Sequence, residues 1–125
     1  MKMTREYGDG RHVITAHDAT WIQVNQTRYE KSLVVLPDAL IPNWGPTDPE
    51  TLTAAALAPI LERSPEILLL GTGPVMRFPG RDILRLFKDR GIGLEVMDTA
   101  AACRTYNVIM NEGRRVAAAL MVPGD

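Results

Sequence analysis

The sequence predicts an α/β fold of three layers around a mixed central β-sheet, and three observations support this prediction. Two runs rich in apolar residues, 66–70 and 116–122, suit strands that are buried on both faces. Apolar residues at helical spacing lie between these runs, from near Arg81 to Gly91 and over residues 99–111. The first third of the chain instead carries short β-rich stretches separated by turn-forming residues. We therefore expect βαβ units in the C-terminal half and an antiparallel β-hairpin or meander at the N-terminus.

A length of 125 residues is typical of one domain, so we expect residues 1–125 to form a single domain. The net charge is −1, with 14 basic and 15 acidic residues well mixed along the chain. Even the basic residues that group between positions 77 and 90 are interleaved with Asp82 and Asp89. A nucleic-acid binder or an anionic-membrane binder should carry a basic excess, so neither nucleic acid nor a lipid surface is expected as a partner.

Cysteine usage and hydropathy predict the compartment. The chain has one cysteine, Cys103, which cannot form an internal disulfide, so a reducing environment is expected. No apolar run approaches the ~20 residues that span a bilayer, and the N-terminus has no apolar signal region. These features predict a soluble cytoplasmic protein without direct membrane insertion.

The N-terminal third should contain three short strands. Residues 1–10 hold two glycines and few apolar residues, so we expect a mobile end there. The β-rich stretches that follow are 11–16, 21–24 and 29–36, and turn-like residues separate them. Their short spacing predicts antiparallel pairing through tight turns.

Residues 37–49 contain four prolines and should form an ordered but irregular loop. Trp44 within it is expected to fold back over an edge of the core, which is a commoner role than ligand binding. Asp48-Pro49-Glu50 predicts a helix start, because Asp can cap, Pro fits the first turn and Glu suits the positive end of the helix dipole. Pro59 should kink or end that helix early.

The C-terminal half reads as strand, helix, strand, helix, strand. Gly91 suits the position just after the first of these helices, and residues 94–97 form the next strand. The second helix, 99–111, should face inward through Ala102, Tyr106, Ile109 and Met110. Right-handed crossovers then make the three strands parallel by default.

Gly71-Thr72-Gly73 is the first candidate binding element. It follows a buried strand, which is where open α/β sheets bind ligands, and glycines let backbone N–H groups approach an anion closely. The dinucleotide fingerprint requires a third glycine where Met76 stands, and no Gly-Lys-Ser/Thr follows, so a P-loop is excluded. A tight structural turn is the favoured interpretation, and contact with a ligand is the alternative.

Asp98-Thr99 opens the second helix at the same edge of the sheet, and either side chain can cap it. Two arginines could reach this edge and bind an anion in bidentate fashion. The candidate anion pocket then comprises Gly71, Thr72, Gly73, Arg77, Thr99 and Arg104. Alternatively, Arg104, Asn107 and Asn111 follow one another at i, i+3 and i+7 and form only a solvated helix face.

No residue is predicted to be catalytic. A cysteine nucleophile needs a base, and the two histidines, His12 and His17, lie far from Cys103 in the sequence. Cys103 follows Ala102 and is expected to be a small buried side chain. Two histidines and one cysteine without close spacing give no metal site, and no cofactor motif is complete.

Four stretches of the sequence resemble one family, the one that includes mitochondrial complex I assembly factor 3 and its bacterial homologues. They are Leu69-Leu70-Gly71-Thr72-Gly73, residues 91–99, Ala102-Cys103-Arg104-Thr105-Tyr106-Asn107 and residues 113–120. The similarity covers roughly residues 11–122 and is strongest over 91–120.

The resemblance implies a three-layer fold with a mixed sheet, in which strand 116–122 could run antiparallel and so against the crossover rule. It implies no enzyme activity, because the mitochondrial members are known as assembly factors for the respiratory NADH dehydrogenase. No catalytic residue is carried over. The chain lacks an Arg- and Ser-rich transit segment, so it is similar to the bacterial members.

Two functions are therefore compared. The first is a non-enzymatic protein that binds a protein partner during assembly of a membrane complex, or that forms a homo-oligomer; it predicts an exposed apolar patch, for example around Trp44. The second is a small-ligand or anion-binding protein, or an unrecognised enzyme, with a pocket at the Gly71-Thr72-Gly73 turn and the helix start at Thr99.

Overall fold

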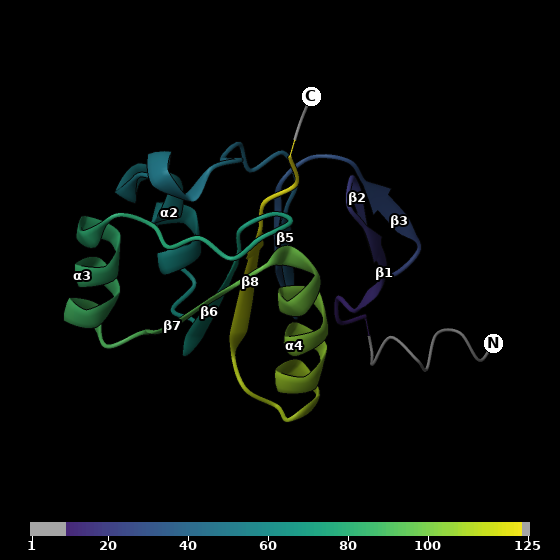
Figure 1. The fold of residues 1–125 in the computed structure, drawn as a ribbon. Coiled ribbons are helices and arrows are strands. Elements are labelled where there is room, and N and C mark those ends of the chain that lie inside the picture. Colours follow the sequence, from purple (N-terminus) through teal and green to yellow (C-terminus); the bar gives the residue numbers. More distant parts are fainter. Residues whose placement is uncertain (1–9, 124–125) are drawn as a thin grey trace.

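The strands form two sheets, and the larger one lies at the centre of the fold (Figure 1). The computed structural model describes residues 10–123, so the expected mobile end at residues 1–10 lies outside the described residues apart from Gly10. The central sheet has five strands, in the spatial order β5 (Ala39–Ile41), β4 (Leu33–Leu36), β8 (Val116–Leu120), β6 (Ile67–Gly71) and β7 (Gly93–Met97). The smaller sheet has three strands, in the order β1 (Ile14–Asp18), β2 (Trp21–Val24) and β3 (Thr27–Tyr29).

Helices cover both faces of the central sheet. Those in residues 10–123 are α2 (Ala54–Leu61), α3 (Arg81–Arg90) and α4 (Thr99–Asn111), with a short 3-10 turn, η1 (Pro49–Thr51), before α2. In Figure 1, α4 and the three-stranded sheet lie on one side of the central sheet, and α2 and α3 lie on the other. None of the helices in this part of the chain is long and apolar enough to cross a membrane.

Strand β8 lies in the middle of the central sheet and gives it its mixed character. It pairs in parallel with β6, where Val116 lies opposite Ile67, and antiparallel with β4, where Leu120 lies opposite Leu33. Strand β6 also pairs in parallel with β7, so both strand–helix–strand units follow the crossover rule. The family resemblance allowed residues 116–122 to run antiparallel, and β8 is antiparallel to β4 but not to β6. The predicted mixed α/β fold is confirmed.

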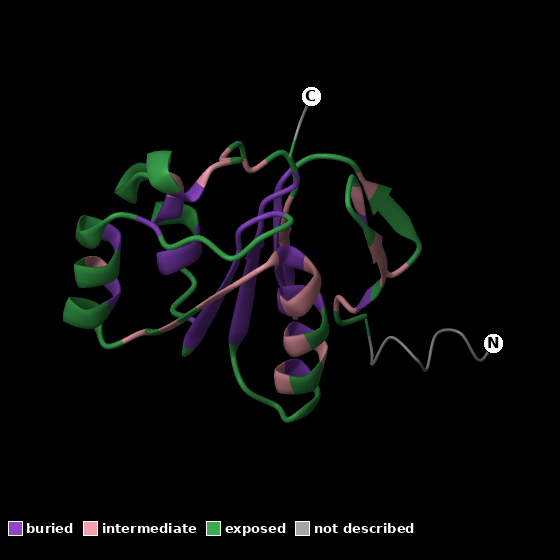
Figure 2. Cartoon of the chain, viewed as in Figure 1, coloured by how far each residue is buried: buried purple, intermediate pink, exposed green. Residues whose placement is uncertain are grey.

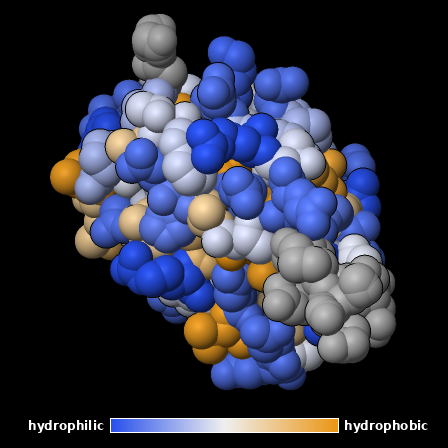
Figure 3. Space-filling view, turned by 90° about the vertical axis from the view of Figure 1, so that its right-hand side faces the viewer, coloured by the Kyte–Doolittle hydropathy of each residue, from blue (hydrophilic) through white to orange (hydrophobic). Residues whose placement is uncertain are grey.

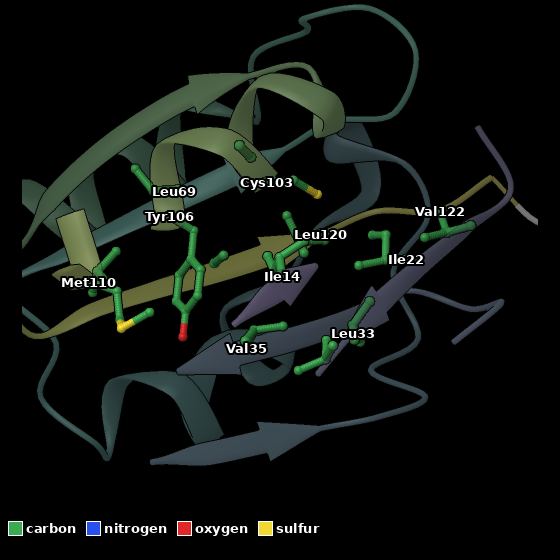
Figure 4. Packing of buried hydrophobic residues seen from close by; sticks show 14 of the residues in the cluster. Ile14, Ile22, Leu33, Val35, Leu69, Cys103, Tyr106, Met110, Leu120 and Val122 are labelled. Atoms are coloured by element: carbon green, nitrogen blue, oxygen red, sulfur yellow. The ribbon is translucent and has the colours of Figure 1, made fainter. Parts of the chain in front are cut away.

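Alternate residues of the central strands point to opposite faces and fill two separate cores. On one face, Val35 and Leu69 pack with α4 and the smaller sheet, and Figure 4 shows Tyr106 extending from α4 into this core. On the other face, Val34 and Leu68 pack with α2 and α3. Figure 2 accordingly shows β6 and β8 as buried. Two covered faces explain why these strands read as unbroken apolar runs.

The first third of the chain forms the expected antiparallel strands, but the boundaries differ from the prediction, and β1 spans 14–18 where 11–16 is predicted. Residues 29–36 are predicted as one strand, whereas the structure divides them between β3 and β4, which belong to different sheets. The physical reason is burial, because β3 is exposed or half-buried while every residue of β4 is buried. Ser32 marks the division: its hydroxyl accepts a hydrogen bond from Val122 N–H at 2.9 Å and holds the chain just before β4.

The proline-rich stretch 37–49 is predicted as an irregular loop, but strand β5 lies inside it. The three residues of β5 lie between Pro37 and Pro42 and pair with β4 at the edge of the sheet, where prolines are tolerated next to a strand. The prediction that Trp44 covers an edge of the core is confirmed. Its indole is half-buried against the core beneath α2, and its Nε1–H donates to the Ala56 carbonyl at 2.8 Å.

The predicted helix start at Asp48-Pro49-Glu50 produces only the 3-10 turn η1. Asp48 does cap it, because its Oδ1 accepts a hydrogen bond from Glu50 N–H at 2.9 Å. Leu52 then adopts an extended conformation, with ψ of 134°, and interrupts the helix. A second cap is therefore needed, and the Thr53 hydroxyl accepts from Ala56 N–H at 3.2 Å at the start of α2.

Pro59 lies inside α2, and the helix continues to Leu61, so the early end that was one of its two predicted effects does not occur. The last turn is held by tertiary packing, since Ile60 and Leu61 are buried against the sheet. The other two helices agree with the prediction. Helix α3 ends at Gly91, which adopts the left-handed conformation with φ of +70°, and α4 spans residues 99–111.

Candidate functional site

The glycine turn at the end of β6 brings helix α4 into direct contact with the sheet. A Cβ atom built on Gly71 would lie 2.9 Å from Thr99 Cα and 3.1 Å from Ala102 Cβ. Such distances leave no room for a side chain, because one of the neighbours is backbone. Gly71 is therefore required for the close packing of α4 on β6.

Thr99 connects three separate segments through its hydroxyl group. The Oγ1 atom accepts a hydrogen bond from Gly73 N–H at 2.8 Å and donates one to the Met121 carbonyl at 2.8 Å. The Thr99 N–H also donates to the Gly73 carbonyl at 2.9 Å. Gly73 has φ of +90°, a conformation that side chains disfavour. The structure thus brings Gly71, Gly73 and Thr99 together, as predicted for the turn, and their polar groups are satisfied within the protein.

Thr72 shapes the loop that leads from β6 to α3. Its side chain is buried, its Oγ1 donates to the Val75 carbonyl at 2.7 Å, and the same oxygen accepts from Arg77 N–H at 3.1 Å. These local bonds form a tight turn of the kind that threonine favours. The hydroxyl of Thr72 therefore organises the loop and is not directed at an open site.

The two arginines of the candidate pocket lie elsewhere. Arg77 Nη2 lies 3.0 Å from Asp48 Oδ1 and 3.4 Å from Glu50 Oε2, in a surface ion pair that tethers the loop to η1. Arg104 is exposed on α4 and lines a separate depression together with His17 and Asn107. The structure does not bring either guanidinium group to the cavity beside Gly73.

A cavity of about 480 Å³ does lie beside Gly73 and Thr99. Residues 17–20, at the end of β1 and in the turn to β2, line its other side, and it lies beyond the C-terminal ends of β6 and β8, where open α/β sheets bind ligands. Two carboxylates line it, from Asp18 and Asp98. The Asp98 carboxylate already accepts the Ala101 N–H at 2.8 Å at the start of α4, so an anion here would meet negative charge at a capped helix end.

The expected burial of Cys103 is confirmed, because its side chain points from α4 into the core (Figure 4). Burial raises the pKa of this thiol to about 12, and the guanidinium of neighbouring Arg104 lowers it only in part. The thiol is therefore protonated at neutral pH and is a poor nucleophile. His12 also has a structural role. Its Nδ1 lies 2.9 Å from both the Leu36 and Ala39 carbonyls, so it contacts β4 and β5 at the turn between them.

Two residues of α4 hold the smaller sheet and the segment before it in place, a role that sequence analysis did not predict. Asn107 Oδ1 accepts from Ile14 N–H at 3.0 Å, and its Nδ2 donates to the Ile14 carbonyl at 2.7 Å. The fully buried Tyr106 donates its hydroxyl hydrogen to the His12 carbonyl at 2.7 Å, and burial raises the pKa of that hydroxyl. Asn107 thus belongs to an interface within the protein, although its spacing with Arg104 predicts a solvated face.

Exposed apolar side chains are concentrated between the end of β6 and the end of α3. The large apolar side chains exposed in the described part of the chain are Val75, Met76, Phe78, Leu84 and Val108. Four of these five lie in the loop before α3 or on α3, whereas Trp44, where the patch was predicted, is half-buried against the core. Figure 3 shows a different face, over α4 and the smaller sheet, where hydrophobic colour is confined to small separate areas.

Comparison with known proteins defines the family. Residues 14–121 match a family whose description is "protein of unknown function (DUF498/DUF598)". The chain belongs to this family. A curated relative of the DUF498/DUF598 chain is NADH dehydrogenase (ubiquinone) 1 alpha subcomplex assembly factor 3 of Danio rerio, which is 34% identical over 112 residues. The match covers 89% of the chain and 64% of the relative, so the chain spans less than two thirds of that protein's length.

Solved structures agree with the fold of the DUF498/DUF598 chain. An NMR structure of a protein from Xanthomonas campestris has a TM-score of 0.83 and 39% identity, and the match covers 98% of this chain and 92% of that one. A solution structure from Bordetella pertussis, described as an Mth938-like domain, has a TM-score of 0.77 and 30% identity over 94% of this chain and 90% of that one. The resemblance predicted from the sequence is confirmed.

Proposed function

We propose that this DUF498/DUF598 chain is a non-enzymatic protein that binds a protein partner during assembly of a membrane-bound respiratory complex. The observation that carries the proposal is its 34% identity, over 89% of its length, to a protein named as an NADH dehydrogenase assembly factor. The proposal places the chain in the cytoplasm, where a single thiol stays reduced.

Two features of the structure support a binding role. Four of the exposed apolar side chains belong to the loop before α3 and to α3, and exposed apolar surface is typical of interaction sites. The groups that sequence analysis considered for chemistry have structural roles instead. The Cys103 thiol is buried and protonated, and the Thr99 hydroxyl forms hydrogen bonds to Gly73 and Met121.

The proposal is tested by deleting the gene in its host and separating solubilised membranes on native gels. Assembled NADH dehydrogenase should fall, and smaller subassemblies that contain its subunits should accumulate. Expression of the wild-type chain should restore the complex, and the restored chain should be recovered with a subassembly. An unchanged amount of assembled enzyme in the deletion strain would contradict the proposal.

Small-ligand binding is the second candidate function, and the cavity of about 480 Å³ beside Gly73 and Thr99 is the observation that favours it. The carboxylates of Asp18 and Asp98 favour a ligand that donates hydrogen bonds or carries positive charge. A thermal-shift screen of amines, nucleosides and small anions tests this. A ligand at 100 times its dissociation constant adds about 2.7 kcal/mol of stability. Ala100→Leu, which adds bulk to the cavity wall, should remove that shift.

A further inference from the structure

Another cavity lies at the end of the central sheet opposite the glycine turn. It is found where β4 ends and where β6 and β8 begin, and the loop from α4 to β8 forms part of its wall. Figure 1 shows this loop at the lower end of the sheet. The cavity has a volume of about 230 Å³. Sites for drug-sized ligands typically have about 300–1,000 Å³, so this one suits a smaller molecule.

The wall of this cavity is rich in arginine. It includes Arg11, Arg114 and Arg115 and one acidic residue, Asp38, so the side chains of the wall carry a net charge of +2. The cavity beside Gly73 is instead lined by two carboxylates. A chain whose total charge is −1 thus concentrates positive charge at one end of its sheet, and such a concentration attracts anions.

Two of the arginines are held in place by hydrogen bonds. The Arg115 Nε–H donates to the Ser64 carbonyl at 3.2 Å, and its Nη2 donates to the Arg63 carbonyl. Arg114 Nε lies 3.3 Å from Glu66 Oε1, and because ion pairs as exposed as this one are weak, an anionic ligand can compete with Glu66. A guanidinium group has five N–H donors, so four in Arg114 and three in Arg115 have no partner among residues 10–123. Donors that are positioned before a ligand arrives lower the entropic cost of binding.

The rest of the wall is largely apolar. Leu36, Met110 and Val116 are buried residues that line the cavity, and Pro37 and Pro65 lie beside them. Guanidinium groups bind carboxylate and phosphate groups with two parallel hydrogen bonds. Apolar walls with a few polar groups are typical of small-molecule sites. The combination therefore suits a ligand that has an anionic group at one end and an apolar body at the other.

We propose that this cavity binds a small organic anion, with its carboxylate or phosphate group on the arginines and a short apolar body against Leu36, Met110 and Val116. The inference goes beyond the proposed function and does not depend on it. Deletion of the gene tests the assembly role, whereas direct binding to the purified chain tests the cavity, so either can fail while the other stands.

The test uses the full chain labelled with ¹⁵N and four probes with the same six-carbon body: hexanoate, hexyl phosphate, 1-hexanol and hexylamine. The two anions should shift the amide signals of residues 36, 38 and 113–116 in a saturable manner. The alcohol and the amine should bind at least about tenfold more weakly, because neither brings an anion to the arginines. Inorganic phosphate should bind at least about threefold more weakly than hexyl phosphate, because it has no apolar body. The tighter of the two anions identifies the preferred anionic group.

Two substitutions in the wall should act in opposite directions. Arg114→Gln should weaken binding of the anionic probes by about tenfold, and Arg114→Lys should retain more of it. Asp38→Asn removes the negative charge of the wall and should strengthen binding by about threefold. Both positions are exposed, so these variants should melt near the wild-type temperature. Arg85→Gln, the same change at an exposed position of α3 outside the wall, is the control and should leave the affinity unchanged.

Several results would overturn the proposal. They are no saturable shift at residues 36, 38 and 113–116, equal binding of hexanoate and 1-hexanol, or weaker binding in Asp38→Asn. An Arg114→Gln chain that is folded and binds hexyl phosphate as tightly as Arg85→Gln would also contradict it. If Arg114→Gln melts well below wild type, the gain in Asp38→Asn decides the question, since loss of structure does not raise affinity.

Discussion

At the scale of single residues, the contacts of Gly71 and Thr99 explain why β6 ends in a glycine turn. The turn allows α4 to contact β6, and the Thr99 hydroxyl joins the ends of β6 and β8 to the helix. A motif that resembles part of a dinucleotide fingerprint thus has a packing role, similar to that of the glycine which permits close contact of helix and strand in such folds.

Replacement of Gly71 by alanine should destabilise the protein. The added Cβ would lie 2.9 Å from Thr99 backbone, which must shift, at a cost of about 1–3 kcal/mol in the free energy of unfolding. Gly93→Ala is the matched control, because its Cβ would meet the nearest atom at 3.5 Å, an ordinary contact. Urea denaturation of both variants measures the difference, and equal stabilities would contradict the packing role.

Cys103 should make stability fall in alkaline solution. Burial raises the pKa of its thiol from 9.0 to about 12, so above pH 9 the unfolded chain loses this proton while the folded chain keeps it. The unfolded state then binds fewer protons, and the free energy of unfolding decreases as pH rises from 9 toward 12. The loss between pH 8 and pH 10 should be about 1.4 kcal/mol. Most of it should disappear in Cys103→Ala, and the part that remains comes from buried Tyr106, whose pKa burial also raises; urea denaturation at both pH values measures the difference.

Residue types in the sequence predicted the burial of Cys103 and the covering role of Trp44, because a small thiol and a large indole have strong intrinsic preferences. The positions of Arg77 and Arg104 were not predictable in the same way. Each is a long flexible side chain, and its direction depends on partners such as Asp48 that only the folded chain brings near.

At the scale of elements, strands and helices of the C-terminal half followed their hydrophobic pattern closely, since both faces of the sheet are covered. The errors lie where tertiary contacts override local signals. Strand β5 forms within a proline-rich stretch because β4 offers it an edge, and α2 continues past Pro59 because its last turn is buried. Neither cause is visible in local sequence.

The two hydrogen bonds from Asn107 of α4 to the Ile14 backbone of β1 connect two elements, and their contribution can be tested. Asn107→Ala should lower the free energy of unfolding by about 2 kcal/mol, because it removes two hydrogen bonds and leaves the Ile14 N–H and C=O groups without partners. Asn111→Ala, at the exposed end of α4, should change stability by less than about 0.5 kcal/mol. Thermal or urea denaturation measures both variants. If Asn107→Ala lowers the free energy of unfolding no more than Asn111→Ala does, Asn107 does not hold β1 in place.

At the scale of the whole molecule, the two sheets should differ in local stability. The smaller sheet packs on the core through Ile14, Ile22 and Val24, but β3 at its outer edge is exposed or half-buried, whereas β6 and β8 are buried throughout. Native-state hydrogen exchange should therefore give amides of β3 protection factors at least about 100-fold below those of β6 and β8. Equal protection in both sheets would mean that the fold opens as one unit.

The position of β8 has a consequence for how the protein is made. Strands β4 and β6 flank β8 and do not pair with each other, so within residues 10–123 the two halves of the sheet are joined only through residues 116–120. During translation, both flanking strands leave the ribosome before this central strand exists. A nascent chain that ends before residue 116 exposes the apolar edges of two half-sheets, which is the kind of surface that chaperones bind and proteases clear. Premature stop codons anywhere upstream should thus yield no stable fragment.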